Sequence, residues 1–277
     1  MNFRDILLVF SVMVYLFSLS AQAAVTEMSA SKLGRSLTPF GSIRSGNKYK
    51  TIPPWTGGIE SFPPGYSGTG QHHIDPFASD KIKFSIDSSN FQSFAKFLTL
   101  GQYAMFKAYP KTFAMDIYPT RRSHSMPAWV LNNTYSNALS SSLTRDGTGI
   151  QLAYGGIPFP ILHGNNKDKA LQTMWNHLTR WRGIFHIASS SELAVQRNGS
   201  YTPVTKQREI FFNFHNPKGS FSSLNNILLY FLTFNKAPAR LAGGALLVHE
   251  TMDQLKDKRQ AWDYNSGQRR VRRAPNL

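Results

Sequence analysis

The second half of the chain alternates apolar and polar positions at the period of β-strands. Stretches rich in β-branched and aromatic residues are separated by turn signals from Gly183 onward. The predicted strands span residues 184–195, 201–214, 227–234, 241–252, 260–264 and 268–273. Asn198-Gly199 is a strong hairpin signal between the first two, and residues 265–267 provide the last turn. Consecutive strands joined by short turns predict an antiparallel sheet.

The first half carries apolar residues at spacings of three and four, the period of a helix. A helix is predicted over about residues 90–108, with Gly101 allowing a kink or a break. Further helices are predicted over about 128–143 and 165–181, and a short strand over 112–118. The apolar stripe of the third helix consists of Leu171, Met174, Trp175, Leu178 and Trp181. The fold class is therefore α+β and mainly β, with helices that cover an antiparallel sheet.

Residues 24–87 lack either pattern. They are rich in Ser, Gly, Pro and Thr, with turn-forming clusters at 53–58 and 63–66. This composition predicts an extended N-terminal arm anchored by Trp55 and Tyr66. The remaining residues, 88–277, are predicted to form one domain, with the helices over about 88–182 and the sheet over about 183–277.

The first 23 residues have the layout of a cleavable secretory signal. A short polar start with Arg4 precedes an apolar run over about 6–19, and small residues lead to a cleavage point between Ala23 and Ala24. The alternative is an uncleaved anchor, but the apolar run is short for a membrane span. The chain has no cysteine, which excludes a lipoprotein anchor, disulfides and thiolate metal sites. We expect an exported protein in the periplasm of a Gram-negative bacterium.

The charge balance becomes informative once export is expected. Lys and Arg outnumber Asp and Glu by 31 to 15, a net charge of +16. Such a surplus predicts attraction to anions. Outside the cytoplasm these are lipid head groups, lipopolysaccharide or cell-wall polymers, and not nucleic acid. The plain alternative is that the charge serves only solubility.

Four arginines gather near the C-terminus, at positions 269, 270, 272 and 273. On a strand, Arg270 and Arg272 share one face, whereas Arg269 and Arg273 share the other. One interpretation is an edge strand whose charges prevent aggregation. The other is a binding strip for phosphate or carboxylate groups, which arginine grips in bidentate fashion.

Signals for catalysis or metal binding are weak. His72 and His73 are adjacent, so in an extended segment they point apart, and no metal-binding spacing supports them. Asp116 could in principle face Glu250 and Asp253 as an acid and a base, but carboxylates paired with arginines are more common. The sequence has no nucleophile elbow, phosphate loop or dinucleotide fingerprint. We therefore expect a protein without catalytic residues, cofactor or metal, with a periplasmic hydrolase as the weaker alternative.

The aromatic content favours either a well-filled core or a lined cavity. A cavity between the sheet and its helices would accept an acyl chain or another apolar ligand. The candidate lining residues are Phe159, Met174, Trp175, Leu178, Trp181 and Tyr230.

Several motifs, taken in order, resemble a known family. They are LTPFG at 37–41, TIPPWTGG at 51–58, DPFA at 75–78, DIYPTRR at 116–122, GGIPFP at 155–160, WNHL at 175–178, RWRG at 180–183 and YNSGQRRVRRAP at 264–275. The chain resembles exported proteobacterial proteins of unknown function that are often described as outer-membrane lipoprotein-sorting proteins. That family is similar to the periplasmic lipoprotein carriers LolA and LolB.

The resemblance implies a strongly curved antiparallel half-barrel with helices on its concave side. It also implies non-covalent binding of a lipid, acyl chain or lipoprotein, and an envelope transporter or outer-membrane protein as partner. Members of the family continue beyond the RRVRR motif, whereas this chain ends at Leu277. We therefore expect a chain that is short relative to the family, with an incomplete sheet, an unprotected last strand, and low stability or solubility.

Overall fold

The computed structural model describes residues 24–274 except 69 and 71, so the predicted signal sequence and Ala23 lie outside the described residues. The chain forms two compact units. The small unit is Ile43–Ser125, and the sheet unit combines the described residues up to Ser42 with those from Met126 onward. The boundary predicted near residue 87 falls inside the small unit.

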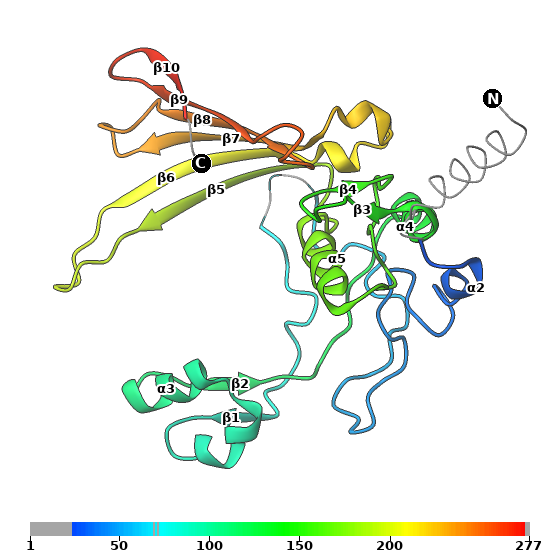
Figure 1. The fold of residues 1–277 in the computed structure, drawn as a ribbon. Coiled ribbons are helices and arrows are strands. Elements are labelled where there is room, and N and C mark those ends of the chain that lie inside the picture. The colour runs from blue at the N-terminus through cyan, green and yellow to red at the C-terminus, as the bar shows by residue number, and fades with distance from the viewer. Residues whose placement is uncertain (1–23, 69, 71, 275–277) are drawn as a thin grey trace, which may run out of the picture. The chain divides into compact units, whose positions relative to one another are not determined.

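The sheet unit contains one antiparallel sheet of six strands in the order β10-β9-β8-β7-β6-β5 (Figure 1). Its strands are β5 (Phe185–Leu193), β6 (Pro203–Phe211), β7 (Ile227–Ala237), β8 (Ala245–Thr251), β9 (Gln260–Asn265) and β10 (Arg270–Arg273). Each predicted strand of the second half is confirmed, and neighbours in sequence are neighbours in the sheet. The expected hairpin at Asn198-Gly199 joins β5 to β6, with Gly199 at a φ of 82°. The long strands β5 and β6 bend toward this hairpin, so the sheet is curved (Figure 1).

Short helices and a small hairpin complete the sheet unit. They are α2 (Glu27–Ala30), α4 (Ala128–Ser140), α5 (Asn166–Leu178), the 3₁₀ turns η2 (Asn213–His215) and η3 (Ser222–Leu224), and the strands β3 (Ser142–Leu143) and β4 (Ile150–Gln151). Helix α5 begins with a capping box, in which the side chains of Asn165 and Asp168 each accept a hydrogen bond from the backbone N–H of the other.

The core of the sheet unit lies at one end of the sheet. It contains Ile150, Ala153, Phe159, Trp175, Phe214, Leu224, Leu228 and Met252. These residues come from α5, β4, η2, η3, the starts or ends of β7 and β8, and residues 153–160, which we call the linking segment. The linking segment is mostly buried and belongs to no helix or strand.

Side chains of α4 and α5 hold the backbone of the linking segment. Asn176 accepts a hydrogen bond from the N–H of Phe159 at 2.9 Å and donates one to its carbonyl at 2.7 Å. Thr134 Oγ1 accepts from the N–H of Ile157 at 3.0 Å. Both helices are therefore committed to this segment and gather at one end of the sheet (Figure 1). The expected helical cover over the concave side is not confirmed, because in the described part of the sheet unit these two helices hold the linking segment and the side chains of β6–β8 stay half-buried along most of their length.

The small unit consists of β1 (Phe84–Ile86), the 3₁₀ helix η1 (Phe91–Phe97), α3 (Leu100–Ala108) and β2 (Met115–Ile117). Its core is Ile86, Phe91 and Phe106, surrounded by further aromatic and aliphatic side chains. The single helix predicted over 90–108 is broken before Gly101. The cause is Thr99, which forms a capping box with Gln102 and so starts a new helix.

The predicted anchors of the arm have partners inside the small unit. Trp55 Nε1 donates to the carbonyl of His124 at 2.9 Å. Tyr66 packs between Phe62 and His73, with ring centroids at 5.2 and 5.7 Å. Arg122 adds hydrogen bonds to the carbonyls of Ile43 and Arg44 at 2.7 and 3.1 Å. The arm is thus ordered by long-range contacts rather than by local periodicity.

Among the described residues, none of the helices combines the length and the apolar composition that a membrane crossing requires.

Gly41 offers a test of the packing around the linking segment. Its φ is 93°, and an added Cβ would collide with the backbone of Pro160. We expect Gly41→Ala to lower the free energy of unfolding by about 2–4 kcal/mol, because it combines backbone strain with overpacking. Gly34 has a similar φ of 78° but open space around its Cβ, so Gly34→Ala should cost only about 1 kcal/mol. Urea denaturation measures both, and equal effects would show that packing against Pro160 is unimportant.

Candidate functional site

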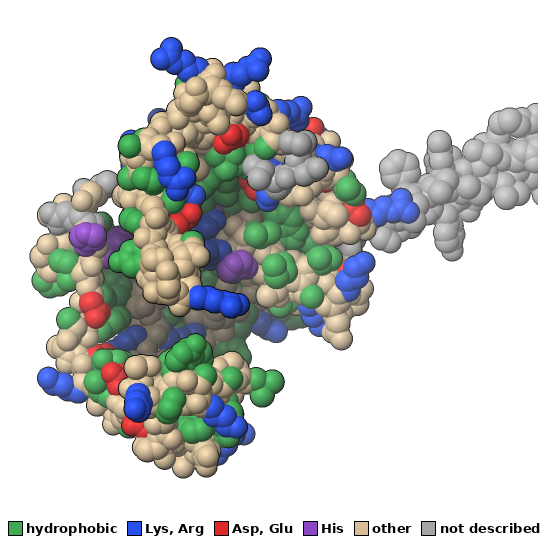
Figure 2. Space-filling view, turned by 90° about the vertical axis from the view of Figure 1, so that its left-hand side faces the viewer, with side chains coloured by type: hydrophobic (Ala, Val, Ile, Leu, Met, Phe, Trp, Pro, Cys, Tyr) green, Lys and Arg blue, Asp and Glu red, His purple; other side chains and the backbone are tan. Residues whose placement is uncertain are grey.

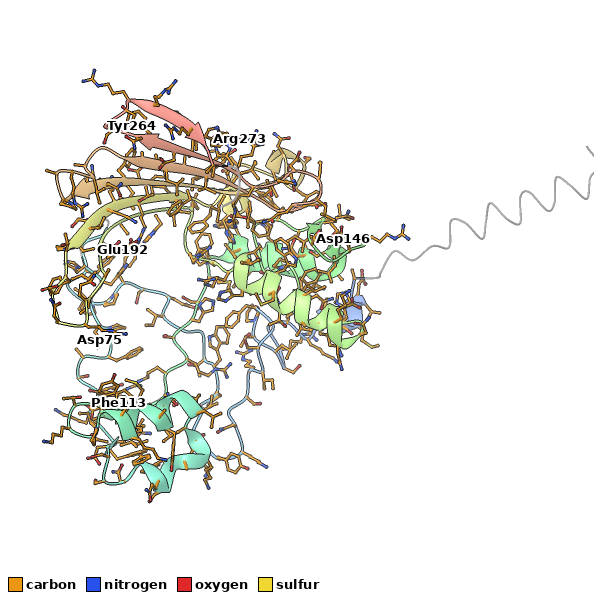
Figure 3. All side chains as sticks on the ribbon, turned by 60° about the vertical axis from the view of Figure 1, so that its left-hand side comes forward. Asp75, Phe113, Asp146, Glu192, Tyr264 and Arg273 are labelled. Atoms are coloured by element: carbon orange, nitrogen blue, oxygen red, sulfur yellow. The ribbon has the colours of Figure 1, made fainter. Side chains whose placement is uncertain are left out.

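The β10 edge of the sheet carries the predicted arginine strip. Arg269, Arg270, Arg272 and Arg273 are all exposed, and within the described part of the chain none forms an ion pair with a carboxylate. Figure 2 shows Lys and Arg side chains gathered at the top of the molecule, where β10 lies in Figure 1. Arg273 pairs with Trp262 of β9 in the register of the sheet, and Figure 3 shows it on the same edge as Tyr264. The strip forms an open cationic surface.

The two faces of the sheet differ in the residues that they present. One face holds an open hollow of about 390 Å³, which we call the groove. It is lined by Arg182, Ile210, Phe212, Leu229, Phe231, Leu246, Val248, Glu250 and Arg259. The groove is apolar along its length and charged at one end.

The strand register explains this arrangement. Ile210 of β6 is opposite Phe231 of β7, and Phe231 is opposite Val248 of β8, so the three form one apolar row. The neighbouring row, which includes Leu229 and Glu250, lies closer to the helices. Residues two apart on a strand point to the same side, so adjacent rows make a continuous apolar strip across three strands.

The charged end of the groove combines two guanidinium groups with one carboxylate. Arg259 Nε lies 2.7 Å from Glu250 Oε2 in a salt bridge. Arg182 stacks over the ring of Phe212, with the guanidinium carbon 4.5 Å from the ring centroid. Desolvation by the surrounding protein lowers the pKa of Arg182 below its usual value, and the positive charge of Arg180 adds to the effect.

His215 lies close to this end and is almost fully buried. Its ring contacts Trp181 and Phe214 edge to face, with centroids at 5.2 and 5.1 Å. Neither ring nitrogen has a hydrogen-bond partner among the described residues. Burial lowers the pKa of His215 to about 4, and the nearby charge of Arg182 contributes. The ring is therefore neutral at physiological pH and adds no second charge beside Arg182.

The opposite face of the sheet carries an aromatic row. Phe211, Tyr230, His249 and Trp262 follow one another across four strands, with centroid separations of 6.2, 4.8 and 4.8 Å. Partial burial lowers the pKa of His249. Tyr230, a predicted cavity residue, thus belongs to the face that does not form the groove.

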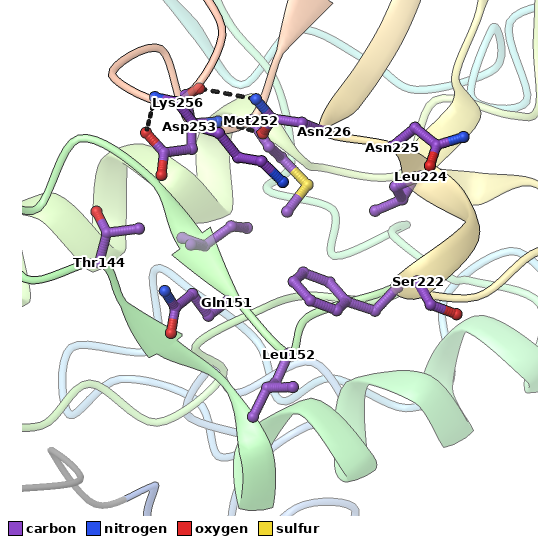
Figure 4. A pocket seen from close by; sticks show the side chains of 12 residues that line it. Thr144, Gln151, Leu152, Ser222, Leu224, Asn225, Asn226, Met252, Asp253 and Lys256 are labelled. Atoms are coloured by element: carbon purple, nitrogen blue, oxygen red, sulfur yellow. Dashed lines mark hydrogen bonds between the residues drawn. The ribbon is translucent and has the colours of Figure 1, made fainter.

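A second hollow of about 450 Å³ lies beside β4, η3 and the end of β8 (Figure 4). Its rim is polar, and several of its polar groups pair with one another. Asn226 exchanges two hydrogen bonds of 2.8 Å with the backbone of Asp253. Asp253 Oδ1 accepts from the N–H groups of Leu255 and Lys256 at 3.0 and 3.1 Å. Asn225 and Asn226 both have positive φ, at 47° and 63°, which turns the chain between η3 and β7. We interpret this rim as a structural corner.

The other predicted cavity residues do not line the groove. Phe159 and Trp175 are buried in the core. Met174 and Leu178 of α5 are exposed by 56% and 44%. Trp181 is half-buried and packs edge to face against Trp129, with centroids 5.4 Å apart. The helix stripe was predicted to face a ligand, but the helix docks on the linking segment instead.

The carboxylates considered for catalysis have local partners. Asp116 accepts a hydrogen bond from Ser85 in the small unit, and Glu250 pairs with Arg259 in the sheet unit. The described residues contain no group of three or more His, Asp or Glu side chains placed to hold a metal ion. Among the described residues, the groove and the arginine strip are the two surfaces that these local pairings leave open.

Fold and site together define an α+β protein with a curved antiparallel sheet and an open apolar groove. The chain belongs to the family described as "Protein of unknown function (DUF1329)", whose profile matches residues 85–277. It is 39% identical over 262 residues to an uncharacterized protein of Pseudomonas aeruginosa, an alignment that covers 95% of this chain and 56% of the relative. The chain thus spans about half the length of the curated relative it matches. The comparison with solved structures gave no match.

Sequence reasoning missed the residues that line the groove, although a signal existed. Each of the three strands contributes two apolar residues that are two positions apart and therefore share one face of the sheet. These are Ile210 and Phe212, Leu229 and Phe231, and Leu246 and Val248. All lie on or directly beside predicted strands. Because both faces of these strands are apolar, the pattern did not indicate which face would stay open.

The burial of His215 predicts a specific pH dependence of stability. The folded state keeps the ring neutral down to about pH 4, whereas the unfolded chain binds a proton near the ordinary histidine pKa of 6.5. As pH falls through this window the unfolded state gains protons first, so the folded state should lose about 3 kcal/mol. His215→Phe should remove this part of the loss, measured by urea denaturation at several pH values.

Phe214→Leu serves as the control, because it removes packing beside the same ring but no titratable group. It should lower the stability equally at every pH. A wild-type pH dependence that survives in His215→Phe would contradict the assignment.

Proposed function

We propose that the chain binds a lipid or another apolar ligand in the groove, without covalent chemistry. The observation that carries the proposal is the apolar strip from β6 to β8, whose side chains stay half-buried while α4 and α5, within the described part of the sheet unit, hold the linking segment. An open apolar surface of this kind is rare on a soluble protein unless it binds something.

The dimensions and chemistry of the groove support an acyl chain. A hollow of about 390 Å³ is within the range of about 300–1,000 Å³ found for small-molecule sites. Each methylene removed from water contributes about 0.8 kcal/mol, so the affinity for a chain should rise about fourfold per methylene until the groove is filled. The curvature of β5 and β6, with Glu192 toward the end of β5 farthest from the helices (Figure 3), fits the half-barrel of lipoprotein carriers.

The predicted signal sequence supports a site of action outside the cytoplasm. We therefore propose a periplasmic role in lipid or lipoprotein traffic or in outer-membrane assembly, with an envelope transporter or outer-membrane protein as partner. The proposal needs neither a catalytic residue nor a cofactor.

Two neighbouring residues of β8 give a matched test of the groove. Val248 lines the groove, whereas Leu247 points to the opposite face, and both are half-buried. We expect Val248→Gln to weaken binding of uncharged ligands about tenfold, because an amide would be placed in an apolar strip. Leu247→Gln should bind nearly as the wild type does. Fluorescence of N-phenyl-naphthylamine, with displacement by decanol and dodecanol, measures the affinities.

The outcome separates the two faces. Equal losses in the two variants, or a larger loss in Leu247→Gln, would place the site elsewhere. A wild-type protein that binds none of these probes would overturn the proposal.

A second candidate function rests on the exposed strip Arg269–Arg273. Four guanidinium groups that have no carboxylate partner among the described residues can attract an anionic membrane surface or cell-wall polymer. Such attraction is screened by salt, whereas binding of an uncharged chain in the groove is not.

We expect the double variant Arg270→Gln, Arg272→Gln to bind vesicles of phosphatidylcholine and phosphatidylglycerol about tenfold more weakly than the wild type. The control is Lys167→Gln, Lys169→Gln, which removes the same charge from exposed positions of α5. Vesicle sedimentation at increasing salt provides the measurement. Equal losses in both double variants would mean that net charge, and not the strip, governs binding.

A further inference from the structure

The charged end of the groove indicates which chemical group of a bound ligand would lie there. Arg182, Arg259 and Glu250 are all lining residues. They carry two positive charges and one negative charge, so this end has a surplus of one positive charge beside a strip that is otherwise apolar. A purely apolar ligand would make no use of this charge.

Glu250 does not neutralise Arg182, because both of its oxygens have other partners. Oε2 forms the 2.7 Å salt bridge with Arg259, and Oε1 accepts a hydrogen bond from Gln254 at 3.1 Å. Among the described residues, no carboxylate forms an ion pair with Arg182. Its one hydrogen bond is to the carbonyl of Leu178, at a long 3.5 Å. Most of the donors of this guanidinium therefore remain available.

Arg182 is also held in position before any ligand arrives. The guanidinium stacks on Phe212, which itself lines the groove, and this contact places the charge where the apolar strip ends. A fixed planar guanidinium binds carboxylate or phosphate oxygens through paired hydrogen bonds and loses little entropy in doing so.

We propose that the ligand is an amphiphile whose acyl chain lies along the row Ile210–Phe231–Val248 and whose anionic head group binds Arg182. This inference rests on the proposed function and adds the class and the orientation of the ligand. The occupant is a lipid carrying a phosphate or carboxylate at one end of its chain. Free inorganic phosphate is not the occupant, since the apolar strip would then stay empty.

A comparison of two ligands tests the proposal on the unaltered protein. Dodecanoate and dodecanol have the same chain length and differ in the head group, which is ionised in the former at about pH 8. We expect dodecanoate to bind about tenfold more tightly, because a hydrogen-bonded charge is worth more than a neutral group. Inorganic phosphate alone should neither bind measurably nor displace N-phenyl-naphthylamine.

The matched variants are Arg182→Gln and Arg180→Gln, which remove the same charge two residues apart. Arg180 does not line the groove and instead donates to the carbonyl of His177 at 2.7 Å. Arg182→Gln should bind dodecanoate and dodecanol with equal affinity. Arg180→Gln should keep the wild-type preference for the anion. Circular dichroism verifies that both variants fold.

The possible failures are distinguishable. If the wild type binds neither ligand, the proposed function itself is wrong. If it binds both equally, or if Arg180→Gln loses the preference as fully as Arg182→Gln does, the groove binds apolar chains but Arg182 is not the head-group site.

Discussion

The fold depends on the need to pair the peptide groups of one buried, irregular segment. Residues 153–160 run through the base of the sheet unit outside any helix or strand, and the prolines at 158 and 160 cannot donate hydrogen bonds. An unpaired buried peptide group costs about 1–3 kcal/mol, so the pairing must come from elsewhere. Asn176 of α5 pairs both groups of Phe159, and Asn137 of α4 accepts a hydrogen bond from the N–H of Tyr154 at 3.0 Å. These side chains fix where the two helices lie.

This commitment of the helices determines what the sheet can do. A helix that binds the linking segment through Asn176 cannot also lie along β6–β8, and the apolar side chains of those strands stay half-buried. The two faces then divide by chemistry. One carries the aromatic row from Phe211 to Trp262, whose rings pack against one another across the strands. The other carries aliphatic and phenylalanine side chains, forms no ring-to-ring pair among the described groove residues, and makes up the groove. The face without internal partners is the one with most to gain from a ligand.

The strands could be predicted from sequence because alternation and turn signals are local. The hairpin at Asn198-Gly199 is an example, since its glycine supplies the positive φ that the turn requires. Two other features could not be predicted, because local patterns do not show how a helix is divided or which element it packs against. Helix 90–108 has a continuous apolar face, but the Thr99–Gln102 capping box divides it. The stripe from Leu171 to Trp181 indicates an amphipathic helix but not the element against which it packs. Tertiary hydrogen bonds attach this helix to the linking segment. The predicted truncation and the lipoprotein-sorting role remain predictions.

Most of the motifs on which the family resemblance rests make structural contacts within these two units. Arg121 forms an ion pair with Asp80 and lies 4.9 Å over the ring of Phe77, and Arg122 binds carbonyls of the arm. In the WNHL motif Asn176 pairs the linking segment. The RWRG motif at 180–183 differs from these, because it combines a packing residue with a residue that lines the groove. Its Trp181 packs between Trp129 and His215, which fixes the backbone just before β5. The next side chain, Arg182, is thereby held at the end of the groove, although no carboxylate in the described chain pairs with it. Arg182 itself is exposed, so its charge carries little burial cost that a partner would have to offset. Its position is informative for another reason: stacking on Phe212 holds a planar guanidinium beside an apolar strip, where the head group of an anionic amphiphile could bind it.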